Sequence, residues 1–366
     1  MSPERSLAVA LADTITTRYP DPDTIPYRVW CYVQGYVLCG LLKLWAATGD
    51  ERYLAYARRF VDQHVTATGE LTGFRGDSLD DMMAGAVIVE LYALTGEERY
   101  RRAAERIYGA FDSYPRNADG GFWHGRSLPG EMWIDGVFMG GMFLVRFGSQ
   151  IAERDACFAE VAHQVVCLAS HCRKGDTGLF LHAYDERRAA AWADPATGLS
   201  PEVWSEGLGW YALILVEALD RWPQGHPGRA PVLAICIELL QGLLRSQDAA
   251  TGLWCQVVDK GHRPDNWHDT SGSAMFVYAL QRASELGIGP VGACAEAARR
   301  GYAGLLRKAV TRPDGLVDIV DACDGVCVQR SYRDYVDYPR VVNAKEAVGS
   351  LLWAATIMAG AAPSAR

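Results

Sequence analysis

A repeated hexapeptide constrains this chain of 366 residues more than any other feature. The sequence TGDERY at 48–53 returns as TGEERY at 95–100. An almost wholly apolar stretch precedes each copy, at 35–47 and at 84–94, and an amphipathic stretch follows it. Glycine commonly ends a helix, and acidic residues suit the start of the next one. Each copy therefore predicts the turn of a helical hairpin.

The alternation of apolar and amphipathic stretches continues along the chain. Apolar helices are expected at 35–47, 84–94, 136–147, 207–219, 272–285 and 346–360. Amphipathic partners are expected at 6–18, after each hexapeptide, and at 151–172, 230–246 and 291–308. A helix that is apolar all round is buried, whereas one with a polar stripe lies at the surface. Six of each predict an all-α fold, a closed (α/α)6 barrel forming one domain over 1–366; a solenoid of the same hairpins is the alternative.

Composition excludes several classes of protein. With 44 acidic against 36 basic residues and a net charge of −8, the chain lacks the basic footprint of a nucleic-acid binder. The longest apolar stretch, 36–47, is too short to span a membrane, and no signal peptide is evident at 1–10. Most of the ten cysteines lie in apolar helical runs without zinc-site spacing. We expect a reduced, cytoplasmic protein without a metal or cofactor, and its oligomeric state stays open.

Polar and aromatic residues collect just before each expected inner helix. These segments are 30–34, 80–81, 132–135, 204–206, 266–269 and 340–345. If the inner helices run parallel, all six segments meet at one mouth of the barrel, which makes a candidate ligand site. Helix capping is the alternative for any single acid, and we favour it for His268 and Asp269. Part of the tryptophan excess is expected at this mouth: Trp30, Trp133, Trp204, Trp210 and Trp267.

Carboxylates within these segments point to sugar chemistry. Asp135 begins an apolar helix beside Trp133, and a carboxyl group buried against an indole suits a general acid. Asp80 and Asp81 supply a second carboxylate from the neighbouring hairpin. Two carboxylates among tryptophan platforms are the parts of a glycosidase.

Longer motifs then indicate a family. They are GGFWH at 120–124, MWIDGVFM at 132–139, HAYD at 182–185, WADP at 192–195, GLSP at 198–201, the run 204–211 and SGSAMF at 271–276. Together they resemble the unsaturated rhamnogalacturonyl hydrolases of glycoside hydrolase family 105, which are related to the unsaturated glucuronyl hydrolases of family 88. The similarity runs from about residue 30 to 353 and implies an (α/α)6 barrel.

The resemblance also implies a reaction and a set of residues. The substrate would be an oligosaccharide ending in a 4,5-unsaturated uronic acid, left by a polysaccharide lyase. Asp135 matches the catalytic aspartate, which protonates C4 of the vinyl ether and helps water to add at C5. Asp80 matches the partner carboxylate best, with Asp81 as the alternative. Sugar-contacting positions are matched by His182, Trp204 and Trp210. His124 lies near them in the motif, and it and Trp133 are further candidates for substrate binding.

One departure from the family pattern concerns charge. Where the family usually reads Trp-x-Arg-x-x-Gly-Trp, with arginine on the uronate carboxylate, this chain has Glu206. A negative charge there should repel a uronate. Arg126, Arg340 and Lys345 are the candidates to supply the missing cation. We therefore expect a substrate other than plain rhamnogalacturonan disaccharide.

Two other functions remain open at this point. An ordinary inverting glycosidase on the same barrel would pair Asp135 with Glu206. A non-catalytic sugar-binding barrel would use the same aromatic mouth without turnover.

Overall fold

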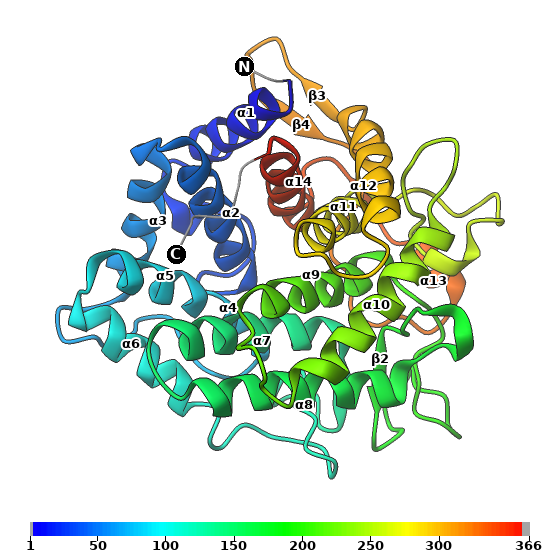
Figure 1. Ribbon diagram of the computed structural model, residues 1–366, viewed down its shortest axis with the longest axis horizontal. Helices are drawn as coiled ribbons and strands as arrows, with labels where there is room; N and C mark the ends of the chain where they lie inside the picture. Colours follow the sequence, from blue (N-terminus) through cyan, green and yellow to red (C-terminus); the bar gives the residue numbers. More distant parts are fainter. Residues whose placement is uncertain (1–2, 361–366) are drawn as a thin grey trace.

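Six apolar helices form the inner ring of the computed structural model, which describes residues 3–360 (Figure 1). Each packs against the next, and the last returns to pack against the first, so the ring is closed. They are α2 (Tyr32–Thr48), α5 (Gly85–Thr95), α7 (Ile134–Gln150), α9 (Ser205–Arg221), α11 (Thr270–Glu285) and α14 (Lys345–Met358). The ends of the expected 1–366 unit, residues 1–2 and 361–366, lie outside the described residues.

Six amphipathic helices cover the inner ring and alternate with it along the chain. They are α1 (Pro3–Arg18), α3 (Glu51–His64), α6 (Glu98–Gly109), α8 (Arg154–Cys172), α10 (Arg229–Ser246) and α12 (Val291–Leu306). This alternation confirms the predicted all-α (α/α)6 barrel. The packing of α14 on α2 closes the ring and excludes the open solenoid.

The repeated hexapeptide builds the same turn twice. Gly49 and Gly96 end α2 and α5 with φ angles of 71° and 68°, a left-handed conformation that strains other residues. The threonine before each glycine donates its hydroxyl to the carbonyl four residues earlier and accepts the N–H two residues later. Asp50 then caps α3 by accepting the N–H of Arg52. The two hairpins therefore share a local cause.

Short elements connect the hairpins and shape one mouth of the barrel. Helix α4 (Leu79–Met83) directly precedes α5 and contains the acidic pair at 80–81, which was expected in a segment before the inner helix. Helix α13 (Tyr332–Val336) comes shortly before the last inner helix, α14, along the chain. Three antiparallel pairs of strands are β1 (Glu131–Trp133) with β2 (Ala183–Asp185), β3 (Ala309–Thr311) with β4 (Val317–Ile319), and β5 (Ala322–Cys323) with β6 (Arg340–Val341).

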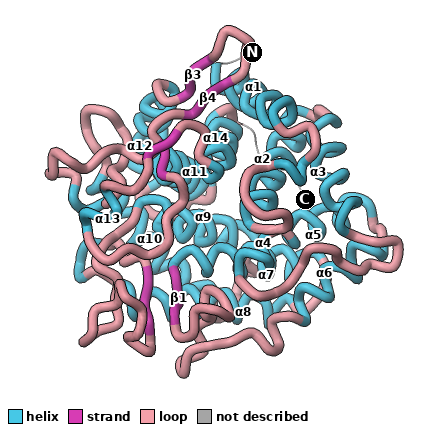
Figure 2. Tube along the Cα trace, turned by 180° about the vertical axis from the view of Figure 1, so that it is seen from behind, coloured by secondary structure: helices cyan, strands magenta, loops and turns pink. Residues whose placement is uncertain are grey.

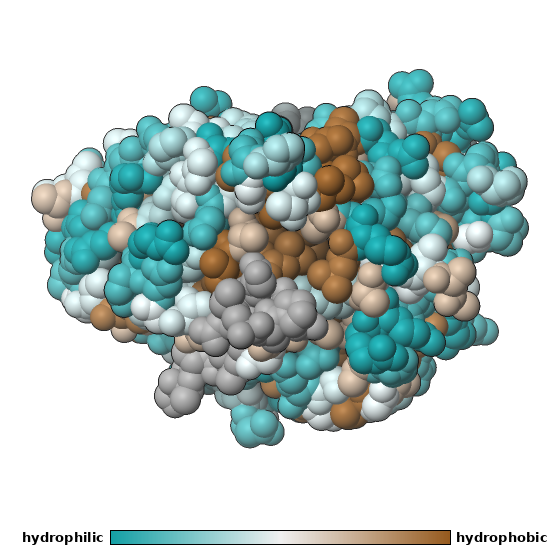
Figure 3. All heavy atoms as spheres, turned by 90° about the horizontal axis from the view of Figure 1, so that it is seen from above, coloured by the Kyte–Doolittle hydropathy of each residue, from teal (hydrophilic) through white to brown (hydrophobic). Residues whose placement is uncertain are grey.

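These strands and many of the loops are seen on the side of the ring shown in Figure 2. Strand β1 leads directly into α7, and its pairing with β2 sets Trp133 opposite Ala183. Seen from above, hydrophilic side chains cover most of the surface and a hydrophobic group lies near its centre (Figure 3). Within residues 3–360, no helix has the length and apolar character needed to cross a membrane.

The C-terminal halves of the inner helices enclose a network of buried charges. Glu217 of α9 accepts hydrogen bonds from Lys43 at 2.8 Å, from Arg146 at 3.1 Å and from the Tyr278 hydroxyl at 2.5 Å. Burial favours the neutral acid, but the charges of Lys43 and Arg146 hold the pKa of Glu217 well below its usual range. Four inner helices, α2, α7, α9 and α11, are tied together here.

Candidate active site

A pocket with a volume of about 110 Å³ lies where the N-terminal ends of inner helices meet. Five of the six expected segments contribute to it; the segment before α11 does not, because Asp269 caps that helix by accepting the N–H groups of Ser271 and Gly272. Seven of the ten predicted site residues line the pocket: Asp80, His124, Trp133, Asp135, Trp204, Glu206 and Trp210. Asp81, His182 and Arg340 do not.

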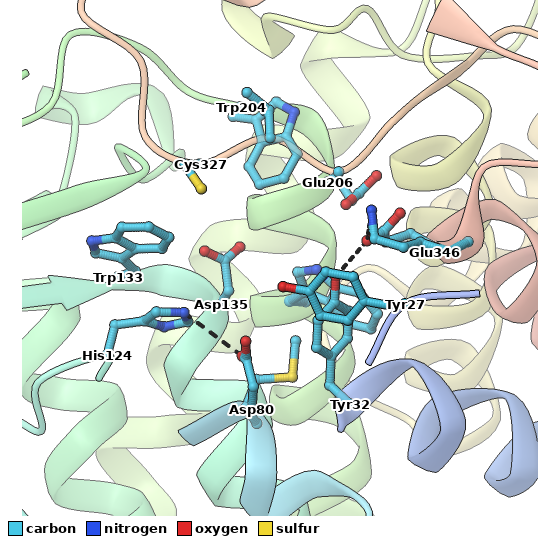
Figure 4. A pocket seen from close by; sticks show the side chains of 15 residues that line it. Tyr27, Tyr32, Asp80, His124, Trp133, Asp135, Trp204, Glu206, Cys327 and Glu346 are labelled. Carbon is cyan, nitrogen blue, oxygen red and sulfur yellow. Dashed lines mark hydrogen bonds and ion pairs between the residues drawn. The ribbon is translucent and has the colours of Figure 1, made fainter. Parts of the chain in front are cut away.

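Asp135 lies in the first turn of α7 and its carboxylate stands near the centre of the pocket (Figure 4). Its Oδ2 lies 3.2 Å from Nε2 of His182, and the other ring nitrogen, Nδ1, lies 2.7 Å from the Tyr335 hydroxyl. That hydroxyl accepts the N–H of Gln329, so its own hydrogen can be donated to Nδ1. This assigns the imidazole hydrogen to Nε2, where it is donated to Asp135. His182 is fully buried and orients the carboxylate from behind instead of lining the pocket.

The second oxygen of this carboxylate is buried near α9. Within the described chain, Oδ1 of Asp135 has no hydrogen-bond partner. Helix α9 comes close to it at Gly207, where a Cβ atom would lie 3.1 Å from this oxygen and 2.9 Å from the Trp204 ring. A larger residue there would push α9 away, so the glycine permits the close approach.

Asp80 faces Asp135 from α4. Its Oδ1 lies 3.7 Å from Nε2 of His124, and its Oδ2 lies 3.9 Å from Arg28. Burial raises the pKa of Asp80, and the charge of Asp135 acts in the same direction, against His124 and Arg28. Asp81 is directed elsewhere, because it pairs with Arg28 at 3.0 Å and accepts the N–H of residue 77. Successive helical residues point about 100° apart, so one of the two acids faces the pocket.

Aromatic rings form the walls of the pocket. The Trp133 indole stacks on the His124 imidazole with centroids 4.3 Å apart and planes at 10°. Trp204 directly precedes α9 and lies above Asp135 in Figure 4. Trp210 is 2% exposed and packs on Tyr36 at 4.6 Å, so most of its ring belongs to the core. Flat rings around polar groups suit the alternating apolar and hydroxyl faces of a sugar.

A third group of charges, on α9 and α14, lies beside Asp135. Lys345 is the one lysine or arginine among the described residues that line the pocket. Its Nζ lies 3.0 Å from Oε1 of Glu346, which also accepts the Tyr32 hydroxyl at 2.5 Å. Glu206 is 1% exposed, and its Oε2 has no hydrogen-bond partner in the part of the chain described.

The charge states of this pair follow from burial. Burial raises the pKa of Glu206 well above its usual range, and the neighbouring Glu346 adds to this, while Lys345 opposes it. The pKa of Glu346 is also raised by burial, but Lys345 and Tyr32 stabilise its charged form. Of the two acids, Glu206 is therefore the one whose neutral, hydrogen-bond-donating form is favoured more strongly.

Several residues expected at this mouth lie outside the pocket. Arg340 is exposed on β6, with its guanidinium over the Trp267 ring at 5.3 Å. Arg126 donates to two backbone carbonyls away from the pocket. Trp30 is 1% exposed and stacks on Phe60, so it belongs to the core. Of the three candidate cations, Lys345 alone reaches the pocket.

Other lining residues were not predicted from the sequence. They are Tyr27, Met139, the segment 325–327 and Glu346, whereas Tyr32 lies in the expected segment 30–34. Glu346 directly follows the polar segment 340–345, so a wider window would have included it. Tyr27 and 325–327 lie in loops whose path depends on distant parts of the chain, and no local pattern marks them.

One group within residues 3–360 has the composition of a metal site: Asp119, Cys167 and His171. Nε2 of His171 lies 2.6 Å from the Asp119 carboxylate, which the Cys167 thiol also contacts, and the imidazole stacks on Tyr184 at 3.8 Å. These contacts account for the cluster without an ion. None of the three residues lines the pocket.

Comparison with known proteins places this site in a family. Residues 7–361 match the model of Glycosyl Hydrolase Family 88. Protein Atu3128 of Agrobacterium fabrum is 37% identical over 194 residues, which cover 48% of this chain and 80% of that protein. The unsaturated rhamnogalacturonyl hydrolase YesR of Bacillus subtilis is 26% identical over 263 residues, or 70% of this chain and 72% of YesR.

A solved structure supports the same assignment. A family 105 glycoside hydrolase from C. acetobutylicum ATCC 824 superposes with a TM-score of 0.89 at 29% identity, over 95% of this chain and 98% of that one. The resemblance drawn from the motifs is thereby confirmed. The chain belongs to glycosyl hydrolase family 88 and is a glycosidase.

Proposed function

We propose that this glycosidase removes the terminal 4,5-unsaturated uronic acid from oligosaccharides produced by polysaccharide lyases. The observation that carries the proposal is the approach of Asp80 and Asp135, from different helices, to one aromatic pocket. The name of the relative YesR supports the substrate class. The proposal includes one domain over 1–366. It also includes a cytoplasmic location, because the ten cysteines along the described chain are free, as is usual in a reducing compartment.

The proposed reaction is hydration of a vinyl ether. Asp135 donates a proton to C4 of the C4=C5 double bond, and positive charge develops at C5 and the ring oxygen. Water adds at C5 and returns a proton to the carboxylate pair. The resulting hemiketal opens to a ketone, and the C1 hemiacetal then releases the rest of the substrate as an alcohol.

The two carboxyl groups suit this sequence of proton transfers. Burial raises the pKa of Asp80 and the charge of Asp135 adds to this, so two buried carboxyl groups facing one space retain a proton more readily than one. His182 fixes one oxygen of Asp135, and the other is buried without a hydrogen-bond partner among the described residues. General acid–base assistance of this kind contributes about 10²- to 10⁴-fold in rate.

Lys345 is the proposed partner of the uronate carboxylate. Its ammonium group has three hydrogens, and Glu346 and the carbonyl of Asp324 take two of them, at 3.0 and 3.3 Å. The third is left for the substrate. Protonated Glu206 adds a neutral donor beside it, so the glutamate does not repel the uronate as its formal charge predicts.

The test is loss of ultraviolet absorbance from lyase-generated unsaturated oligosaccharides. Asp135→Asn should lower kcat by about 10²- to 10⁴-fold, and Asp176→Asn, an exposed residue outside the pocket, is the matched control. An ordinary hydrolase pairing Asp135 with Glu206 would release sugar without consuming the double bond. A binding protein would show no turnover and would keep its affinity in Asp135→Asn. Either result contradicts the proposal.

A further inference from the structure

A second groove, lined by residues 191–194, 197, 199–201 and Arg330, is larger than the catalytic pocket. Its volume is about 480 Å³, against about 110 Å³ for the pocket. Trp192 is half-buried and supplies the aromatic surface, whereas Arg330 supplies the positive charge. We call this feature the Trp192 groove.

Two structural elements join the groove to the pocket. The Glu131 carboxylate accepts the indole N–H of Trp133 at 2.9 Å and is also hydrogen-bonded to Trp192. One acid therefore fixes a ring in each cavity. The segment 325–330 is the second link, because 325–327 line the pocket and Arg330 lines the groove.

Backbone hydrogen bonds fix the shape of the groove. Asp185 is 1% exposed and accepts three N–H groups, those of residues 187, 189 and 190, at 2.9, 2.7 and 2.8 Å. Asp194 accepts the N–H and the hydroxyl of Thr197 at 2.7 and 2.9 Å. On the other wall, Gln329 donates to the Tyr335 hydroxyl that also holds the histidine behind the catalytic aspartate. A cavity formed in advance binds its ligand with less loss of conformational entropy.

Arg330 differs from its basic neighbours in having no partner. Arg263 and Arg333 both pair with Asp265 at 3.4 Å. Arg330 is exposed and forms no ion pair or hydrogen bond with any residue that the structure describes. A guanidinium with five unused donors matches a carboxylate, which it can bind through two parallel hydrogen bonds.

We propose that the Trp192 groove binds the sugars that follow the unsaturated residue, with one ring stacked on Trp192 and its carboxylate paired with Arg330. The inference rests on the proposed function and narrows its substrate class to acidic oligosaccharides. A glycoside with a small neutral aglycone would fill the pocket and leave the groove empty.

Three substrates separate the contributions of the groove. They are the methyl glycoside of the unsaturated uronic acid, an unsaturated trisaccharide with acidic second and third sugars, and its counterpart with neutral ones. Arg330→Ala should lower kcat/KM for the acidic trisaccharide alone, by about two- to fivefold, the effect of an exposed ion pair. Trp192→Ala should lower it for both trisaccharides. Neither should change turnover of the methyl glycoside, and Arg330→Lys should retain much of the activity.

The controls keep the inference separate from the proposed function. Arg299→Ala removes an exposed arginine on α12 that pairs with Glu296 of the same helix, and it should change nothing. Equal losses on all three substrates, or no loss on the acidic trisaccharide, would overturn the inference. Failure of the wild type on every substrate would refute the function instead. Calorimetry with a saturated acidic trisaccharide then tests the inference about the groove without any turnover. Arg330→Ala should weaken the binding of this trisaccharide, and unchanged binding overturns the inference.

Discussion

Replacing Lys345 by methionine tests how the pocket accepts an anionic sugar despite its acidic lining. Lys345 has one ammonium hydrogen left for a substrate carboxylate after its contacts with Glu346 and Asp324. A hydrogen bond to a charged group contributes about 1.5–3 kcal/mol. At 1.4 kcal/mol per factor of ten, this corresponds to about 10- to 150-fold in affinity. We expect KM of Lys345→Met for the unsaturated disaccharide to rise by about that factor, with a smaller change in kcat.

The assay compares two forms of one substrate. The free uronic acid carries the charge that Lys345 binds, and the methyl ester does not, so the variant should resemble the wild type on the ester. Lys345→Arg keeps the positive charge and is the matched control. Since Lys345 also stabilises the charged form of the buried Glu346, unfolding by urea is measured in parallel. A rise in KM that is equal for acid and ester, or an unchanged KM for the acid, refutes the reasoning.

Three further outcomes follow from the buried groups. Glu206→Gln should bind substrate normally near neutral pH, since its amide still donates a hydrogen bond. In the wild type, deprotonation of Glu206, whose pKa is raised, should increase KM at higher pH, and the variant should not show this increase. The pH profile of KM measures both effects. Tyr335→Phe removes the hydroxyl that holds His182, so kcat should fall by about 2- to 10-fold with a displaced pH–rate profile, whereas a merely structural role would leave that profile unmoved. Glu217→Gln leaves Arg146 buried without one of its charged partners, so urea unfolding should show a loss of about 3–5 kcal/mol. Because the pKa of Glu217 is lowered in the fold, its contribution is present above its unfolded pKa and is lost as pH falls, so wild type and variant should converge in acid.

The barrel could be predicted because its determinants are local. Each hexapeptide contains the glycine that ends one helix and the acidic residue that begins the next, and both glycines take the left-handed conformation. Helices that are apolar all round have one stable place, inside the ring. The short helix α4 was not predicted, because the apolar pattern begins at 84 and the acidic pair at 80–81 reads as a polar segment before it.

The site could be predicted in part, for a related reason. Asp135 follows directly from its place at the start of an apolar helix beside Trp133, which the fold brings to the common mouth. To choose between Asp80 and Asp81, one must know how α4 is rotated about its own axis. That rotation depends on the packing of α4 and on the ion pair between Asp81 and Arg28. The contact between His182, just before β2, and Tyr335 of α13 joins two segments that are far apart in the sequence, and no local pattern in either segment predicts it.

Glu206 shows why a residue in a motif must be interpreted with its neighbours in space. Alone it is a negative charge where relatives usually carry arginine, which argues against an anionic substrate. Next to Glu346 and Lys345 of α14, burial raises its pKa and favours its neutral form, and the positive charge comes from the lysine. An arginine at this position would compete with Lys345 for Glu346 and would bring a second cation into the same corner. The glutamate and the lysine therefore act together: Lys345, on a helix far along the sequence but close in space, replaces the arginine that the motif lacks.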